Sequence, residues 1–486
     1  DLQLKDFNSS LERSTMVGMF GRVAYNYKQK YFLSVTLRRD ASSKFGENTR
    51  WGTFPSYAIA YTFSEEPYMD WARDFLDFGK IRLSYGKSGK QFEYPYFAFG
   101  VLIVNNIPFH GNQTITPYWP NGLINPKLSW EETKQFDAGL DLEFFGNRLS
   151  LELDYYYRYT DKLLAQVTLP GDYNAYTAQW QNAYAISNQG IELQIKADLI
   201  RSEKLHWDFS FNIARNWNRF EKSNNGMDFT NLASKHNLNI IGKPLNGIYV
   251  YNDQGYYNSQ DEVPLYYVNG RRKYLSSLGN QIYSPGDRRI QDVDGNGQVA
   301  TMVPLLEDRV YGGSPLPLAF GGIASTLKWK GIDVNLLFSY KLGRHVLNAG
   351  RGASVGTILR ANTAEMMVPI LADLDKVSFW QKPGDNTDFP INELENGKNN
   401  FATNLKSNVE KINYLKLKSI SIGYILPVFP KQSKHYARVF MSVENVFTIT
   451  NSSSPDPESI DIVTGVDSNN NYPLATRFTL GLTLNL

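Results

Sequence analysis

Apolar and polar residues alternate along several stretches of this chain. Between residues 149 and 159 the apolar phase is Leu149, Leu151, Leu153, Tyr155, Tyr157 and Tyr159. The same period of two occurs in residues 136–144, 191–199 and 207–213, and it is typical of β-strands whose two faces differ. These stretches last roughly 9–13 residues. Strands of soluble sheets average about 5–6 residues, whereas about 9–11 residues cross a bilayer at a tilt.

The pattern predicts about 13 long strands. They span 14–27, 31–41, 53–63, 78–88, 130–144, 148–160, 184–199, 206–219, 317–329, 332–342, 412–426, 436–449 and 474–486. In the strand 412–426 the alternation changes phase between Leu417 and Ile420, which predicts a β-bulge.

The connections between these strands alternate between short and long. The short ones are 28–30, 145–147, 200–205, 330–331 and 427–435, while 64–77 is intermediate. The longest are about 89–129, 220–316, 343–411 and 450–473. Outer-membrane barrels have short periplasmic turns and long outer loops. The sequence therefore predicts an all-β, transmembrane antiparallel β-barrel with extracellular long loops, a periplasmic C-terminus, and contact with lipid and lipopolysaccharide.

The predicted number of strands is odd. Single-chain bacterial barrels have an even number, so we expect residues 1–486 to form the C-terminal part of one barrel domain. The plug and earlier strands would come from missing sequence or from a separate chain.

Composition adds three constraints. Aromatic residues make up 14% of the chain, including 31 Tyr and 28 Phe, and Tyr and Trp concentrate at membrane–water interfaces. The formal net charge of +2 gives no reason to expect a nucleic-acid partner. Cysteine is absent, which excludes disulfides and thiolate chemistry.

Several segments carry a family resemblance. They are GRVAYNYKQKYFLSVTLRRDASSKFG (21–46), RWGTFPS (50–56), PGDRRIQDVDGNG (285–297), YLKLKSISIGYILP (414–427), RVFMSVENVFTIT (438–450) and DPE (456–458). Together they resemble the SusC/RagA-type TonB-dependent transporters of the Bacteroidetes outer membrane. The resemblance implies a plugged barrel of about 22 strands, a SusD-like surface lipoprotein as lid, and import of oligosaccharides or peptides driven by the TonB complex through an N-terminal segment.

One segment, DVDGNGQ (292–298), is similar to the start of an EF-hand-type calcium loop, where oxygen ligands alternate and a glycine permits the turn. The twelfth position, Val303, offers no carboxylate. The resemblance implies a closing Asp-Arg pair, which is Asp308-Arg309 in this chain. The candidate Ca²⁺ ligands are Asp292, Asp294, Asn296, Gln298 and Asp308. The alternative is a solvated Asx/Gly turn.

Aromatic residues also gather in the long connections. Flat rings with polar tips can stack on sugars or anchor peptides, and they can equally pack the loops together. The candidate substrate-binding residues are Tyr94, Tyr96, Tyr118, Trp119 and Trp180. Since no H-E-x-x-H, phosphate-loop or G-x-S-x-G motif occurs, we expect no catalytic residue and no enzyme.

The leading functional hypothesis is therefore the C-terminal barrel portion of a TonB-dependent importer. Three alternatives remain open: a passive porin, a secreted β-rich adhesin or glycan-binding protein, and a non-transporting structural subunit of a larger outer-membrane assembly.

Overall fold

The computed structural model of the chain describes residues 13–94, 98, 102–104, 107–109, 113–115, 118–120, 123–169, 178–223, 226, 229–230, 236–268, 270–277, 280–299, 308–350, 378–391, 404–427, 435–468 and 472–485. The chain divides into two compact units, residues 1–197 with 217–227 and residues 198–216 with 228–486. In the described part of the chain, no helix has the length and apolarity required to cross a membrane.

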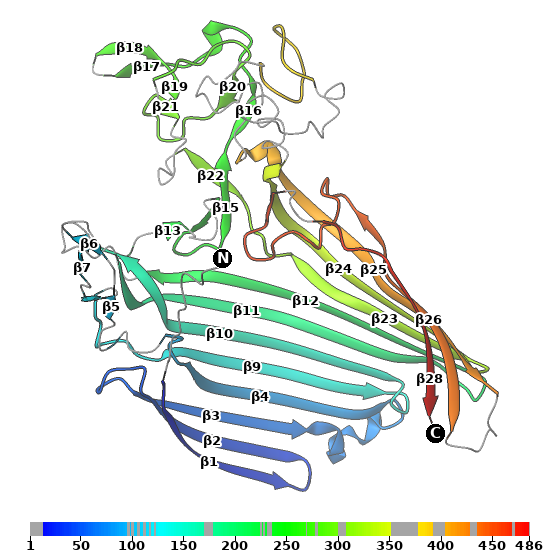
Figure 1. Cartoon of the computed structure of the whole chain (residues 1–486). Coiled ribbons are helices and arrows are strands. Elements are labelled where there is room, and N and C mark those ends of the chain that lie inside the picture. The colour runs from blue at the N-terminus through cyan, green and yellow to red at the C-terminus, as the bar shows by residue number, and fades with distance from the viewer. Residues whose placement is uncertain are drawn as a thin grey trace. The chain divides into compact units, whose positions relative to one another are not determined.

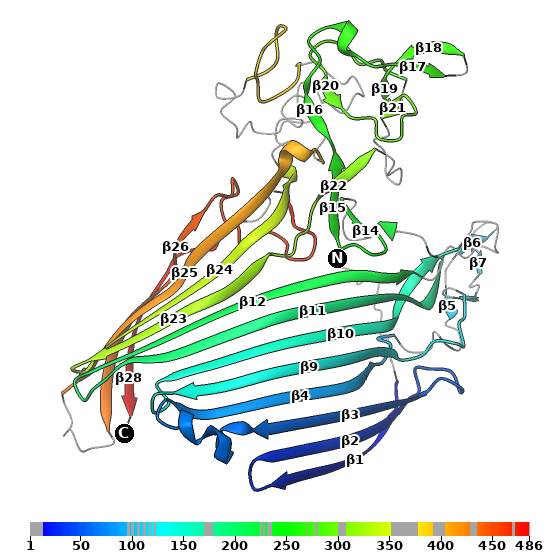
Figure 2. The same cartoon turned by 180° about the vertical axis from the view of Figure 1, so that it is seen from behind.

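The first unit contains seven long strands among its described residues. They are β1 (Met16–Tyr27), β2 (Tyr31–Ser42), β3 (Trp51–Thr62), β4 (Leu76–Lys90), β9 (Glu131–Phe144), β10 (Leu149–Thr168) and β11 (Ala178–Arg201). They pair antiparallel in that order. Figures 1 and 2 show them side by side from blue to green-cyan.

Six more long strands follow in the chain. They are β12 (Leu205–Ser223), β23 (Ala319–Trp329), β24 (Ile332–Asn348), β25 (Val409–Leu426), β26 (Tyr436–Thr450) and β28 (Arg477–Asn485). Each pairs antiparallel with the next. Both β11 and β12 have residues in each of the two units. The thirteen long strands of the described chain confirm the strands predicted from the sequence.

Short elements occupy the connections. Before β12 these are the 3-10 helices η1 (Phe63–Glu65) and η2 (Pro67–Ala72) and the strands β5 (Leu102–Val104), β6 (Ile107–Phe109), β7 (Gln113–Ile115) and β8 (Tyr118–Pro120). After β12 these are β13 (Phe229–Thr230), β14 (Asn237–Asn239), β15 (Gly247–Tyr251), β16 (Asp253–Tyr256), η3 (Gln260–Glu262), β17 (Leu265–Val268), β18 (Arg271–Tyr274), β19 (Ser276–Ser277), β20 (Arg288–Ile290), β21 (Gln298–Val299), β22 (Arg309–Gly313), η5 (Lys406–Asn408) and β27 (Val466–Asp467).

The strand registers separate an apolar face from a polar one. In the second unit, one cross-strand row is Trp207, Leu327, Val334, Ile422, Met441 and Leu480. The adjacent row on the other face is Asp208, Thr326, Asn335, Ser421, Ser442 and Thr479. The first unit has the corresponding apolar row Leu33, Ile59, Leu83, Ala138, Tyr155 and Ile191. The apolar rows include many exposed side chains, such as Ile59, Ile422 and Leu480.

An ion cluster crosses three strands on the polar face of the first unit. The Arg82 guanidinium donates two hydrogen bonds to Asp141, of 2.8 and 2.7 Å, and a third of 2.9 Å to Asp154. Gly139 lies opposite both Arg82 and Asp154. A Cβ atom at this position would come within 2.5 Å of the Asp154 carboxylate and 2.6 Å of the guanidinium, so the cluster requires glycine here.

The predicted bulge in β25 is confirmed. Lys418 is the extra residue, because Leu417 and Ser419 pair with the adjacent residues Phe338 and Leu337 of β24. Some strands are longer than predicted: β10 continues to Thr168 and β11 begins at Ala178. Asp161 and Lys162 interrupt the alternation of β10, but the backbone ladder continues past them through register shifts around Leu163.

The intermediate connection between β3 and β4 lies beside the short turns of the first unit. The Phe145 N–H donates to the Phe75 carbonyl, and the Lys30 ammonium donates 2.5 Å to the Glu65 carbonyl. Tyr31 stacks on Tyr61 at 5.1 Å between ring centroids. The connection therefore belongs to the short-turn end of these strands, which carries aromatic side chains.

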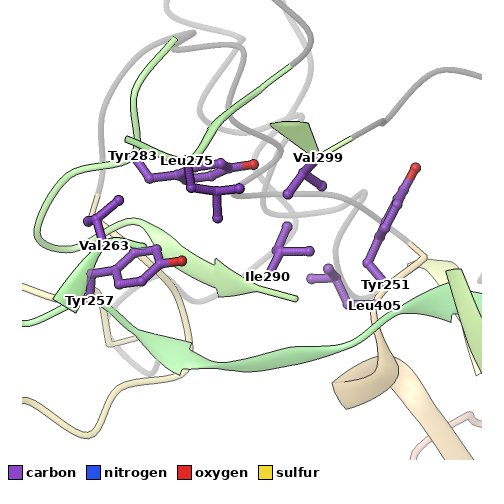
Figure 3. Close-up of a cluster of buried hydrophobic side chains, with 8 residues drawn as sticks. All are labelled: Tyr251, Tyr257, Val263, Leu275, Tyr283, Ile290, Val299 and Leu405. Atoms are coloured by element: carbon purple, nitrogen blue, oxygen red, sulfur yellow. The ribbon is translucent and has the colours of Figure 1, made fainter. Parts of the chain in front are cut away.

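The connection between β12 and β23 contains a hydrophobic core of its own. It comprises Tyr251, Tyr257, Val263, Leu275, Tyr283, Ile290 and Val299, together with Leu405 from the following connection. Figure 3 shows these eight side chains gathered from separate strands and turns. A second small cluster packs Ile248 and Val250 against Leu347 and Ala349. This segment is a folded subdomain rather than an extended loop.

Residues 451–468, between β26 and β28, fold onto β24 and β25. The buried Lys416 ammonium lies 3.0 Å from Asp456 and 3.1 Å from Glu458. Lys418 lies 2.8 Å from Glu458. Arg344 is only 1% exposed and donates to the carbonyl oxygens of Pro315 and Asp461. β27 also pairs with β24 in parallel. Ion pairs, hydrogen bonds and a short ladder thus fix this segment.

Candidate functional site

The candidate calcium loop at residues 292–298 is built by local side-chain to backbone hydrogen bonds. The Asp292 carboxylate accepts the N–H groups of Gly295 and Gly297, both at 2.8 Å. Asp294 accepts the Asn296 N–H at 3.0 Å, and the Asn296 side-chain oxygen accepts the Gln298 N–H at 2.7 Å. Gly295 and Gly297 have φ angles of +74° and +80°, which side-chain-bearing residues rarely adopt.

Asp308 joins this loop from ten residues further along the chain. It is fully buried and accepts the Val293 N–H at 2.9 Å. Carboxylate oxygens of Asp292, Asp294 and Asp308 all lie within 4.8 Å of one another. The structure therefore brings together three of the five candidate ligands. Val303, the twelfth position of the loop, lies outside the described residues.

The surroundings bear on what this cluster can hold. Oxygens that share a Ca²⁺ at about 2.3–2.6 Å can be separated by at most about 5 Å, so the three carboxylates fit one ion. Burial and the nearby Asp292 carboxylate raise the pKa of Tyr266 to about 12. A Cβ on Gly297 would lie 3.1 Å from the Tyr266 side chain. The Gln298 side-chain amide instead donates 2.9 Å to Asn280.

A second group of possible metal ligands lies at the β11–β12 turn. Asp198, His206 and Asp208 each offer one ligand atom within 4.8 Å of the others. His206 Nε2 lies 3.0 Å from Asp208, and Asp198 accepts a bond from Arg201. These pairings compete with a metal ion for the same oxygens.

Two of the candidate substrate-binding residues meet in the structure. The rings of Tyr94 and Trp180 lie 5.7 Å apart, and each contacts Phe92, at 5.6 and 5.0 Å respectively. Trp180 also packs against a buried cluster that includes Phe45. Tyr94 remains 45% exposed. Trp180 is thus partly buried against a local core, whereas Tyr94 presents a ring to solvent.

The structure describes the remaining aromatic candidates only in part. Tyr96 falls outside the described residues. Tyr118 and Trp119 belong to the backbone of β8, which pairs with β5.

Sequence reasoning missed the two residues that organise these sites. Phe92 joins Tyr94 to Trp180, and Tyr266 supports the turn at Gly297. Neither lies in a motif. They could have been found as large apolar residues within long polar connections, because such residues are usually buried in a local core.

Comparisons with known proteins agree with this architecture. Residues 3–349 match the sequence profile of a family described as TonB dependent receptor-like, beta-barrel. TonB-dependent receptor P3 of Formosa agariphila is 30% identical over 505 residues, which cover 98% of this chain and 46% of that protein. TonB-dependent receptor SusC of Bacteroides thetaiotaomicron is 27% identical, with 100% of this chain and 45% of that protein covered.

A solved structure of the RagAB peptide transporter has a similar fold. The TM-score is 0.73 at 23% identity, and the match covers 97% of this chain and 48% of that one. The chain thus spans less than half of the length of the curated relatives that it matches.

Proposed function

The chain belongs to the TonB dependent receptor-like, beta-barrel family, and from this premise we propose that it forms barrel wall and outer loops of an outer-membrane importer. The family predicted from the sequence motifs is confirmed, together with the all-β fold. The proposed activity is TonB-dependent import of oligosaccharides or peptides.

The observation that carries this proposal is the separation of faces. Each unit has an apolar row that crosses successive strands. In the second unit a row of polar residues lies beside it on the other face. A membrane barrel needs this arrangement, since lipid contacts one face and water the other. The exposed Tyr68 and Trp71 at the short-turn end suit the aromatic girdle of such a barrel.

We further propose the partners that a complete importer of this kind requires. These are a plug and additional strands, a SusD-like lipoprotein lid over the long connections, and the TonB complex. The short turns would then face the periplasm, as would the end of β28. The resemblance of the sequence motifs to SusC/RagA-type transporters supports a lipoprotein partner.

Import predicts a specific phenotype. In the source bacterium, deletion of the whole gene should abolish uptake of one labelled class of oligosaccharide or peptide, and collapse of the proton motive force should do the same in the wild type. Uptake that persists without the proton motive force would indicate a passive porin. Normal uptake of all tested nutrients in the deletion strain, with the protein recovered in an outer-membrane assembly, would indicate a structural subunit.

For the 292–308 region we propose a Ca²⁺ site. Asp292, Asp294 and Asp308 would supply carboxylate oxygens, while Asn296 and Gln298 lie where further oxygen ligands could complete the shell. Each Asp292 oxygen accepts one backbone N–H and has a further lone pair for an ion. One Asp294 oxygen accepts the Asn296 N–H and the other accepts the Asn296 side-chain amide. The buried Asp308 supports the ion over the solvated turn, because a local Asx turn does not need a distant carboxylate.

Calcium should stabilise this subdomain measurably. With free Ca²⁺ at about 100 times the dissociation constant, the folded state gains about 2.7 kcal/mol, so hydrogen exchange of residues 292–299 should slow on adding Ca²⁺ and recover with chelator. Asp308→Asn should weaken Ca²⁺ binding by about tenfold or more. Asp261→Asn, an exposed acid on η3, is the matched control. Equal exchange with Ca²⁺ and with chelator would identify a solvated turn.

Among the aromatic candidates, we propose Tyr94 as a ligand contact, held by Phe92 and Trp180. Tyr96, Tyr118, Trp119 and Trp180 remain proposals of the same kind.

A further inference from the structure

A polar cavity of about 620 Å³ lies in the second unit, within the connections that flank β23 and β24. Its wall comes from four places: β16, the η3 region, β20 and the segment 384–389, with η5 closing one side. The volume is that of an ordinary small-ligand site. No candidate residue from the sequence lines it.

The cavity wall is held together before any ligand binds. Arg288 is buried and donates 3.0 Å to Asp253, whose other oxygen accepts the Ser407 N–H at 2.9 Å. The Tyr256 hydroxyl donates 3.2 Å to the Thr387 carbonyl. The Gly384 N–H donates 2.7 Å to the Asn258 side chain. These bonds join all four wall segments, so little ordering free energy is needed on binding.

Donors without partners line the cavity. Arg289 is exposed, and it makes no ion pair or side-chain hydrogen bond with the described residues. The same holds for the side chains of Gln254 and Asn386 within the described ranges. All three can therefore donate to a ligand.

Acceptors are fixed in the same cavity. Glu262 uses one carboxylate oxygen to accept the Asn258 N–H at 2.9 Å. One oxygen of Asp385 accepts the N–H groups of Gln381 and Lys382. The other oxygen of each carboxylate accepts no hydrogen bond from the part of the chain that the structure describes.

From these contacts we infer that the cavity binds a neutral saccharide. Sugar hydroxyl groups donate and accept at once, which matches Arg289 and the amides on one side and Glu262 and Asp385 on the other. The Tyr256 ring, held by Arg288 at 5.5 Å, adds an aromatic surface suited to a sugar face.

The charge and the lining of the cavity disfavour acidic ligands and peptides bound through apolar side chains. The Asp253–Arg288 pair is neutral, which leaves Arg289 against the carboxylates of Glu262 and Asp385. The excess negative charge disfavours uronates, sulfated sugars and acidic peptides. Peptide recognition commonly relies on sheet-edge pairing or apolar side-chain pockets, whereas only Tyr256 and Phe389 contribute large apolar side chains here.

This inference rests on the proposed import function, because that function places the cavity on the outer side of the membrane. Of the two proposed ligand classes, oligosaccharide and peptide, the cavity favours oligosaccharide. Binding and uptake are measured separately, so that each proposal can fail alone.

The test uses the whole detergent-solubilised protein and calorimetric titration. The probes are neutral gluco-, manno-, xylo- and galacto-oligosaccharides, with oligogalacturonate and oligolysine for comparison. We expect one neutral series to bind. Arg289→Ala should weaken that binding about tenfold or more, since it removes a charged donor, and so should the isosteric Glu262→Gln. The matched control Arg271→Ala, an exposed arginine on β18, should bind like the wild type.

Two results would overturn the inference: binding of oligolysine or oligogalacturonate alone, or saccharide binding that both cavity variants leave unchanged. Melting temperatures identify a variant that does not fold, in which case Glu262→Gln decides. Proton-motive-force-dependent uptake without any neutral saccharide bound would leave the import function standing and refute the cavity assignment. Saccharide binding with no uptake in cells would support the cavity assignment and refute the import function.

Discussion

Replacing Leu480 with arginine is expected to prevent assembly of the folded barrel. Leu480 pairs with Met441 at the end of an apolar row that continues across the second unit. In the proposed membrane, a lipid-facing Arg near the bilayer centre costs about 2–4 kcal/mol, and loss of the leucine side chain adds about 1.5–3 kcal/mol. The sum approaches the total stability of many folded proteins, about 5–15 kcal/mol. Outer-membrane fractions should therefore lack the heat-modifiable folded band.

The neighbouring substitution Thr479→Arg is the control for this result. Thr479 pairs with Ser442 on the polar face, where the new side chain would meet water. Both variants introduce one arginine, at adjacent positions of β28, so they differ only in the face that carries it. Equal assembly of the two variants would show that the faces have been assigned wrongly.

Lys416→Met is expected to release residues 451–468 from β24 and β25. The substitution keeps the volume of the side chain but leaves Asp456 buried without its cation. Breaking a buried ion pair in this way typically costs about 3–5 kcal/mol. Hydrogen exchange and proteolysis of residues 451–468 should both accelerate, while the long strands remain protected.

Lys411→Met, at an exposed position of the same strand, should leave the segment in place.

The pH dependence of the segment provides a second check of the Lys416–Asp456 pair. Burial raises the pKa of Asp456, but hydrogen bonds from the Glu458 N–H and the Lys416 ammonium outweigh it and hold the pKa below its usual value. The stabilisation is therefore complete above about pH 4 and is lost as the pH falls through the lowered pKa. In Lys416→Met this transition should move to higher pH, and an unchanged transition would contradict the role of the pair.

The long strands could be predicted because their two faces meet different surroundings. Residues 149–159 carry that difference as a strict alternation, and even the bulge near Lys418 was visible as a change of phase. The end of β10 beyond Thr160 was not predicted, because Asp161 and Lys162 interrupt the alternation and the adjacent Leu163 and Leu164 are both apolar. Its ladder depends on backbone hydrogen bonds that any residue except proline can make.

The sites were predictable only where their residues are neighbours in sequence. The turn around Asp292 follows from local side-chain to backbone bonds, and the resemblance pointed to Asp308. The cavity could not be found in this way. Arg289 and Asp385 are separated by almost a hundred residues, and no periodic pattern relates them. The subdomain core had a detectable signal, because apolar residues such as Tyr257, Leu275 and Val299 recur in a connection too long to be a simple loop.

The extra residue Lys418 divides the pairing of β25 with β24 into two blocks, one before it and one after it. Within either block, inserting or deleting one residue would turn the remaining apolar side chains of that block from one face to the other. Removing Lys418 itself would restore uninterrupted pairing with β24, because Leu417 and Ser419 already face the adjacent residues Phe338 and Leu337. Towards β26, however, the same deletion would leave both Asn445 and Val446 between the pairs Leu417–Phe447 and Ser419–Glu444, so relief on one side of β25 creates a wider bulge on the other. The lysine that occupies the bulge reaches Glu458 instead of lipid.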